Sequence, residues 1–140
     1  MEGIVADGDS VVVTGAERTL TYRPRRVTVS DGTFVMHTSR GGGMSSVWFT
    51  DLGDCFVEVV HLGAGPEGGE LVLVVPGRDT VAIGDLYVRK PRSAGPSWPR
   101  AVELAVGLTT PATRILTSRG EISRDELEDF HQRLLGLIHG

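Results

Sequence analysis

The sequence contains one cysteine, Cys55, and lacks any run of about 18 apolar residues, the length that spans a membrane. A single cysteine excludes an internal disulfide and a zinc site built from several thiolates. We therefore expect Cys55 to be a small buried residue, with a reactive thiol as the alternative. No charged segment followed by an apolar stretch opens the chain. These absences predict a cytoplasmic protein that makes no contact with a membrane.

The chain also lacks a strong excess of charge of one sign, because 18 acidic residues face 14 basic ones and the formal net charge is −4. The basic residues, all but one of them arginine, are spread along the sequence, so no nucleic-acid-binding surface is expected. Their densest group is Arg23-Pro24-Arg25-Arg26. We interpret this group as a solvated turn between strands, with an anion-binding patch as the alternative.

A chain of 140 residues has the length of one ordinary domain and can bury about two-thirds of the surface that it exposes when unfolded. We expect a single domain over residues 1–140. The hydrophobic pattern divides it into a β-rich amino-terminal segment, residues 1–46, and a second part, residues 47–140, that combines strands with helices.

Apolar and polar residues alternate through the first half, and turn dipeptides interrupt the alternation, as is typical of β-strands. Asp31-Gly32 can supply the positive φ angles of a two-residue hairpin turn. The glycines at 41–43, among small and polar residues, indicate a mobile loop. The predicted strands are Val11–Thr14, Thr19–Tyr22, Val27–Ser30, Thr33–His37, Val47–Thr50 and Phe56–His61.

Strands in the second half are more continuously apolar, which predicts a sheet covered by helices on at least one face. Leu71–Val75 and Val81–Gly84 indicate a hairpin, and Arg114–Leu116 a further short strand. Leu71–Val75 reads Leu-Val-Leu-Val-Val and is apolar on both faces. We therefore expect this strand to be buried on both.

Apolar residues at helical spacing predict two main helices, at about 98–108 and 124–138, on one face of this sheet. Ser97 is a candidate cap for the first helix, and Pro99 fits its first turn. The sequence Ser-Arg-Asp-Glu at 123–126 matches a capping box for the second helix.

Asp85 directly follows Gly84 at the end of a predicted strand. Loops gather at such strand ends, and open sheets place ligand-binding groups there. A turn aspartate that bonds its own backbone is the structural alternative. The order of the segments around Asp85 bears on the choice.

From Val47 to Leu137 these segments form an ordered series that resembles the carboxy-terminal half of the metallo-β-lactamase superfamily. The resemblance implies an α+β fold that corresponds to half of a four-layer αββα sandwich, with a mixed, mostly antiparallel sheet. The matching pieces are Leu52-Gly53-Asp54, the stretch from Val57 to Gly65, the strand that leads to Pro76, the stretch from Val81 to Leu86, the helix at Trp98, the strand Arg114–Leu116 with Thr117-Ser118-Arg119-Gly120, and the terminal helix.

In that family the aspartate at this strand end bridges two metal ions, usually zinc or iron, which activate a water molecule for hydrolysis. Asp85 looks like this bridging ligand. Pro66 and Arg119 occupy the positions of two histidine ligands, and the family's amino-terminal histidine motif does not occur in the chain. The resemblance therefore implies a degenerate site with no catalytic residue, in which Arg119 replaces a cation and pairs with Asp85. No cofactor is expected, unless another chain completes a site for zinc, iron or manganese.

Three further residues are candidate binding groups. His61, at the end of a predicted strand, is a possible base or ligand, with an ordinary strand histidine as the alternative. Glu67 and Glu70 are expected in a loop beside Asp85, where three carboxylates would hold a hard cation weakly. His131 is expected on the exposed side of the last helix and suggests no site.

Half of an αββα sandwich leaves one apolar sheet face without a cover. Either the strands before Val47 cover it, or two copies pair across a two-fold axis. We favour a homodimer, because Leu71–Val75 must be buried on both faces.

Three functions remain open at this point, because a fold alone does not select a ligand. We favour a module that binds a small molecule or a protein and has no metal-dependent hydrolase activity. The first alternative is a hydrolase of esters, thioesters or lactams whose metal site is completed by dimerisation or by a partner chain. The second is a structural or assembly protein.

Overall fold

The structure is a computed structural model that describes residues 3–30, 34–37, 46–65, 68–92 and 94–139. Within these residues the chain is an α+β protein, mostly strands, with two sheets and two α-helices. The amino-terminal sheet is an antiparallel meander of β1 (Ile4–Asp7), β2 (Ser10–Thr14), β3 (Thr19–Arg23), β4 (Arg26–Val29) and β5 (Phe34–His37).

The second sheet has the strand order β11-β10-β9-β8-β7-β6. Its neighbours run antiparallel except for β9 and β10, which are parallel, and the short 3-10 helix η1 (Pro76–Arg78) joins β8 to β9. The strands are β6 (Ser46–Asp51), β7 (Phe56–Gly65), β8 (Gly68–Val75), β9 (Thr80–Gly84), β10 (Arg114–Thr117) and β11 (Gly120–Ile122).

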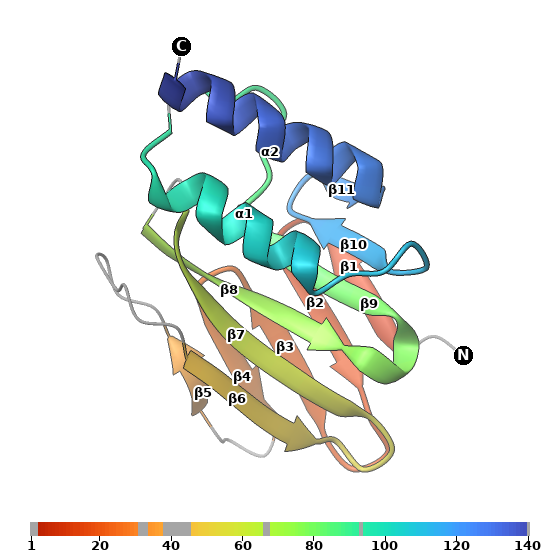
Figure 1. Cartoon of the computed structure of the whole chain (residues 1–140). Coiled ribbons are helices and arrows are strands. Elements are labelled where there is room, and N and C mark those ends of the chain that lie inside the picture. Colours follow the sequence, from red (N-terminus) through yellow and green to blue (C-terminus); the bar gives the residue numbers. More distant parts are fainter. Residues whose placement is uncertain (1–2, 31–33, 38–45, 66–67, 93, 140) are drawn as a thin grey trace.

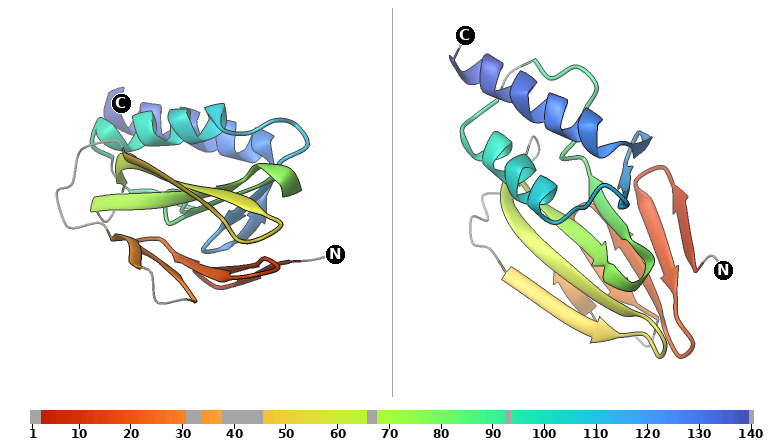
Figure 2. Two further views of the ribbon diagram at one scale, coloured as in Figure 1. Left: turned by 90° about the horizontal axis from the view of Figure 1, so that it is seen from below. Right: turned by 45° about the vertical axis from the view of Figure 1, so that its right-hand side comes forward.

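Three layers result from these elements. Helices α1 (Ser97–Gly107) and α2 (Arg124–His139) lie on one face of the second sheet, and the amino-terminal sheet lies on the other (Figures 1 and 2). The strand β8 shows the consequence, because its side chains alternate between two separate cores. Leu71, Leu73 and Val75 pack with the amino-terminal sheet, whereas Val72 and Val74 pack with the helices. The expectation that this strand is buried on both faces is confirmed.

The amino-terminal strands thus cover the sheet face that half of an αββα sandwich would leave exposed. Backbone hydrogen bonds at both ends of the interface between the two sheets hold them together. At one end the Glu17 and Arg18 amides donate to the Leu52 carbonyl, and at the other the Leu71 amide donates to the Pro24 carbonyl at 2.7 Å. Our reason for expecting a homodimer through this face is therefore removed. Within the described residues no helix lies on the outer face of the amino-terminal sheet, so three layers are present where the full sandwich has four (Figure 2).

Every predicted strand is present, and most ends shift by no more than two residues, although β7 continues four residues beyond the predicted His61 and β8 begins three residues before Leu71. The predicted hairpin at Asp31-Gly32 joins β4 to β5, which are antiparallel, although the turn residues themselves and the glycines 41–43 lie outside the described residues. Two strands were not predicted: β1, whose residues are mostly exposed, and β11, which has three residues. Both lie at sheet edges, where one-sided burial leaves a weak pattern.

Both predicted helices are present, but the capping of α1 was predicted wrongly. Pro96 precedes the helix and Ser97 is already its first residue, without a side-chain cap. At α2 the Glu126 amide donates to the Ser123 hydroxyl at 3.0 Å, which is half of the predicted capping box. The Glu126 carboxylate instead accepts a hydrogen bond from the Tyr87 hydroxyl at 2.7 Å. Neither helix is long and apolar enough to cross a membrane, as far as the described residues show.

Candidate functional site

The candidate site lies where the parallel strands β9 and β10 end. Parallel neighbours bring their carboxyl ends to the same sheet edge, so the residues that follow them meet. The Ser118 amide donates to the Gly84 carbonyl at 3.1 Å and joins the two turns. Beside this contact, Nη1 of Arg119 donates to Oδ1 of Asp85 at 3.3 Å. The expected ion pair between Asp85 and Arg119 is confirmed.

The turn after β10 is ordered by the hydroxyl of Thr117. This hydroxyl accepts a hydrogen bond from the Arg119 amide at 3.0 Å and donates to the Gly120 carbonyl at 2.8 Å. The side chain of Arg119 is 45% exposed and that of Asp85 is 25% exposed. Apart from its bond to Asp85, the guanidinium makes no hydrogen bond to the described residues, so most of its donors face solvent. The site therefore presents a cation held in place by a less exposed carboxylate.

A second ion pair joins the two sheets. Nη2 of Arg25, in the turn between β3 and β4, lies 3.2 Å from Oε2 of Glu70 on β8. The Glu70 side chain is fully buried, whereas that of Arg25 is 39% exposed. Glu70 is therefore part of a strand and of an intersheet contact, and our expectation of a loop residue beside Asp85 was wrong. The turn at 23–26 is present as predicted, but it is not simply solvated, because Arg23 also pairs with Asp9.

The buried hydroxyl of Tyr22 lies within the electrostatic influence of one carboxylate from each ion pair. It donates to the Leu71 carbonyl at 2.7 Å. Burial raises the pKa of Tyr22 well above its usual value, and the negative charges of Asp85 and Glu70 raise this pKa further. Both carboxylates thus act on one hydroxyl. We name Arg25, Glu70, Asp85 and Arg119 the charged rim.

Replacing Tyr22 with phenylalanine tests this arrangement. The Leu71 carbonyl would lose its buried donor, so we expect the free energy of unfolding at pH 7 to fall by about 1–2 kcal/mol. In the wild type the raised pKa of Tyr22 means that the folded protein holds the phenolic proton more tightly than the unfolded chain. Stability is therefore fully present below pH about 10 and falls as the pH rises above it.

Urea denaturation between pH 8 and pH 11.5 measures both effects. In Tyr22→Phe the alkaline loss of stability should be smaller than in the wild type. Burial also raises the pKa of Cys55 and of Tyr87, so a smaller alkaline loss from these two groups should remain. An unchanged alkaline slope in Tyr22→Phe would contradict the position assigned to this hydroxyl.

The other residues predicted for the site lie apart from this arrangement or outside the description. His61 is buried within β7, which continues to Gly65, so it does not end a strand as we expected. Its neighbours across the sheet are Ser46 and Leu71. Glu67 lies outside the described residues. The structure therefore brings together Asp85 and Arg119 as predicted, whereas Glu70 pairs with Arg25.

The metal site implied by the resemblance is a poor fit to these donors. A bridging carboxylate needs further histidine or carboxylate ligands around it. Asp85 instead contacts a guanidinium, which has no lone pair for a metal, and Glu70 contacts Arg25. Across the described part of the chain, no group of three or more histidine, cysteine, aspartate or glutamate side chains is placed to hold a metal ion.

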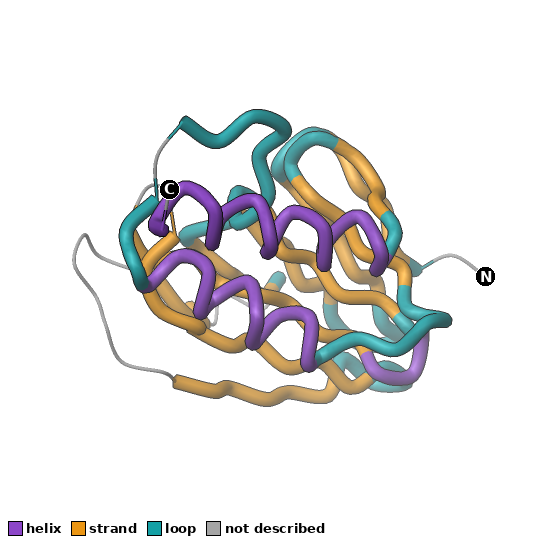
Figure 3. Tube along the Cα trace, turned by 45° about the horizontal axis from the view of Figure 1, so that its top comes forward, coloured by secondary structure: helices purple, strands orange, loops and turns teal. Residues whose placement is uncertain are grey.

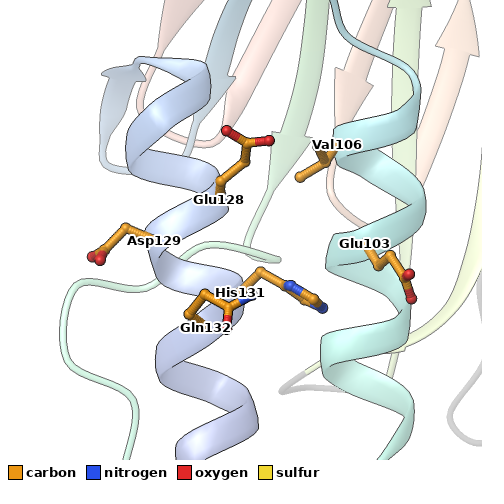
Figure 4. A pocket seen from close by; sticks show the side chains of 6 residues that line it. All are labelled: Glu103, Val106, Glu128, Asp129, His131 and Gln132. Atoms are coloured by element: carbon orange, nitrogen blue, oxygen red, sulfur yellow. The ribbon is translucent and has the colours of Figure 1, made fainter.

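A cavity of about 290 Å³ lies between α1 and α2, on the far side of the helices from the sheets' shared core. Figure 4 shows Glu128 and His131 pointing from α2 toward α1, with Val106 facing them. His131 lies among exposed residues of the two helices, but its own side chain is half-buried here. The apolar spacing of α2 could not indicate this cavity, because its lining depends on how the two helices pack. It is lined by Glu103, Val106, Glu128, Asp129, His131 and Gln132.

Comparisons with known proteins add no relative to this description. No family model matches the chain, and no curated protein matches its sequence.

Proposed function

We propose that this protein is a non-catalytic binding domain, related to the metallo-β-lactamase fold in its second half, that holds a small molecule at the charged rim. The ligand carries a carboxylate or a phosphate group. Arg119 supplies the recognition, because its guanidinium presents donors in a fixed plane that matches such oxyanions. Asp85 orients the guanidinium by accepting one of its hydrogen bonds.

The observation that carries this proposal is the Asp85–Arg119 pair, at 3.3 Å and with most guanidinium donors directed to solvent. An ion pair as exposed as this one contributes little to the stability of the fold, so stability alone does not explain it. Its place at the carboxyl ends of two parallel strands is the place where open sheets commonly bind ligands. The turn that carries Arg119 is held by the Thr117 hydroxyl, which reduces the entropy lost on binding.

The metal-dependent hydrolase is the weaker candidate. It would require zinc, iron or manganese to displace Arg119 from Asp85 and to find its remaining ligands on another chain. The guanidinium already neutralises Asp85, so a cation would gain less attraction there than at a free carboxylate. We therefore propose binding without hydrolysis.

Nuclear magnetic resonance with a set of small carboxylates and phosphate monoesters tests this function. Binding should shift the backbone signals of Gly84, Ser118 and Arg119 first. For the tightest compound, Arg119→Gln should weaken binding at least about tenfold, since it removes a charge-assisted, two-pronged contact.

Arg100→Gln is the matched control, because Arg100 is an exposed arginine on α1, away from β9 and β10. This variant should bind like the wild type. If the shifted signals instead surround the cavity between α1 and α2, or if Arg119→Gln binds as tightly as the wild type, the proposal is wrong.

A further inference from the structure

Among the described residues, the strand β6 forms one edge of the second sheet and carries the exposed aromatic residue Phe49. It pairs with β7 on one side and ends the second sheet on the other. Figure 3 shows it along the outer border of the sheet, with neither helix above it. In an edge strand, every second residue directs its N–H and C=O groups away from the sheet, where they can pair with another strand.

Natural proteins usually protect such edges with lysine, proline, a bulge or short length. β6 has none of these features. It has six residues, Ser-Val-Trp-Phe-Thr-Asp, and pairs with β7 in an unbroken register. The other edge strands in the described sheets are shorter: β1 and β5 have four residues each and β11 has three. Among the described residues, the Arg18 guanidinium donates to the carbonyl of Asp51 at one end of the β6 edge.

Two aromatic rings extend this edge into an apolar patch. Phe49 on β6 is 55% exposed and Phe56 on β7 is 47% exposed. Their rings stack with centroids 5.9 Å apart and planes inclined by 21°. Phe49 lies opposite Glu58, two residues from Val60 of the helix-side core, so alternation places both rings on the helix side of the sheet. The two rings therefore form an apolar part of this sheet face that the helices do not cover.

We propose that two copies of this chain pair through β6, antiparallel and about a two-fold axis at Phe49. The second sheet then continues from one copy into the other, and the two aromatic pairs meet across the axis. This geometry is closed, because each copy uses its β6 edge once. The proposal does not depend on a ligand at the charged rim.

The charges of β6 are compatible with a second copy at this edge. In the antiparallel register that places Phe49 opposite itself, Asp51 lies opposite Val47 and Trp48 lies opposite Thr50. Asp51 is the single charged residue of β6, and in this register it does not face Asp51 of the second copy. The destabilising contact between two like charges is therefore avoided. Arg18, which hydrogen-bonds to Thr50 and to Asp51, adds a positive charge at each end of the paired strands.

Light scattering coupled to size-exclusion chromatography tests the dimer over a range of protein concentrations. We expect the mass of two chains for the wild type. Phe49→Lys places two positive charges together at the axis and should raise the dimer dissociation constant at least tenfold, giving the mass of one chain. Because Phe49 is more than half exposed, this variant should keep the wild-type circular dichroism spectrum and melting temperature at low concentration.

Val5→Lys is the matched control, since Val5 is an apolar residue, 62% exposed, on the edge strand β1 of the other sheet. This variant should remain a dimer. Phe49→Thr keeps the preference for a strand and should still weaken the dimer. A wild type that stays monomeric, with its edge covered by another segment of the chain or left for another protein, would overturn the proposal. A Phe49→Lys variant that stays dimeric would also overturn it.

Discussion

Phe130→Ala should lower the free energy of unfolding by about 3–5 kcal/mol, the largest effect that we expect from a single substitution in this chain. Phe130 is fully buried on α2. Its ring centroid lies 4.9 Å from that of Tyr87 and 5.9 Å from that of Trp98. The contacts of the Phe130 ring join α2 to α1 and to the segment after β9. Removing this ring would leave a cavity that the helices cannot readily close.

Urea denaturation followed by circular dichroism measures this change. Leu137→Ala is the control on the same helix, because Leu137 is 39% exposed and its truncation leaves little or no cavity. We expect this control to lose no more than about 1 kcal/mol. Equal losses in the two variants would mean that α2 does not pack on the sheet through Phe130.

Gly84→Ala should cost about 2–4 kcal/mol, the sum of a backbone effect and a steric effect. Gly84 has a φ of +56°, in the left-handed region that side chains disfavour. A Cβ atom at this position would lie 2.6 Å from the Tyr22 hydroxyl and 2.9 Å from Cγ of Pro24. Both neighbours belong to the amino-terminal sheet, so an added methyl group would push the two sheets apart beside the charged rim.

Gly8→Ala separates the two effects. Gly8 has nearly the same φ, +61°, but nothing lies within 4 Å of the Cβ atom that alanine would add. Its loss should be about 1–2 kcal/mol, from the backbone alone. Thermal and urea denaturation of both variants give the difference. If Gly84→Ala is no less stable than Gly8→Ala, the two sheets do not pack as closely at Gly84 as we describe.

The local elements of this fold could be predicted from the sequence, but the relation between its two sheets could not. Periodicity identified α1, α2 and the strands that bury one face against a core, whereas β8, which is buried on both faces, was identified by its continuous apolar run. Leu108 shows the limit of that method. It continues the apolar stripe of α1, yet it lies just beyond the helix and is 37% exposed. The packing of the amino-terminal sheet depends on contacts between distant residues, such as Glu17 with Leu52, which have no periodic signal.

The candidate site was predicted in part for the same reason. Asp85 and Arg119 were paired through a family resemblance that covers the second half of the chain. Tyr22 and Arg25 were missed because they come from the first 46 residues, to which the resemblance does not extend. One signal was present: a glutamate such as Glu70, next to a strand apolar on both faces, needs a cationic partner if it is buried. The arginine-rich turn at 23–26 could have been considered as its source.

Native mass spectrometry of protein produced in medium supplemented with zinc, iron and manganese tests most directly whether the partner of Asp85 is Arg119 or a metal ion. We predict that every chain carries the mass of its polypeptide alone, in the wild type and in Asp85→Asn. One or two metal ions per wild-type chain, lost in Asp85→Asn, would contradict the proposed binding domain and favour the hydrolase.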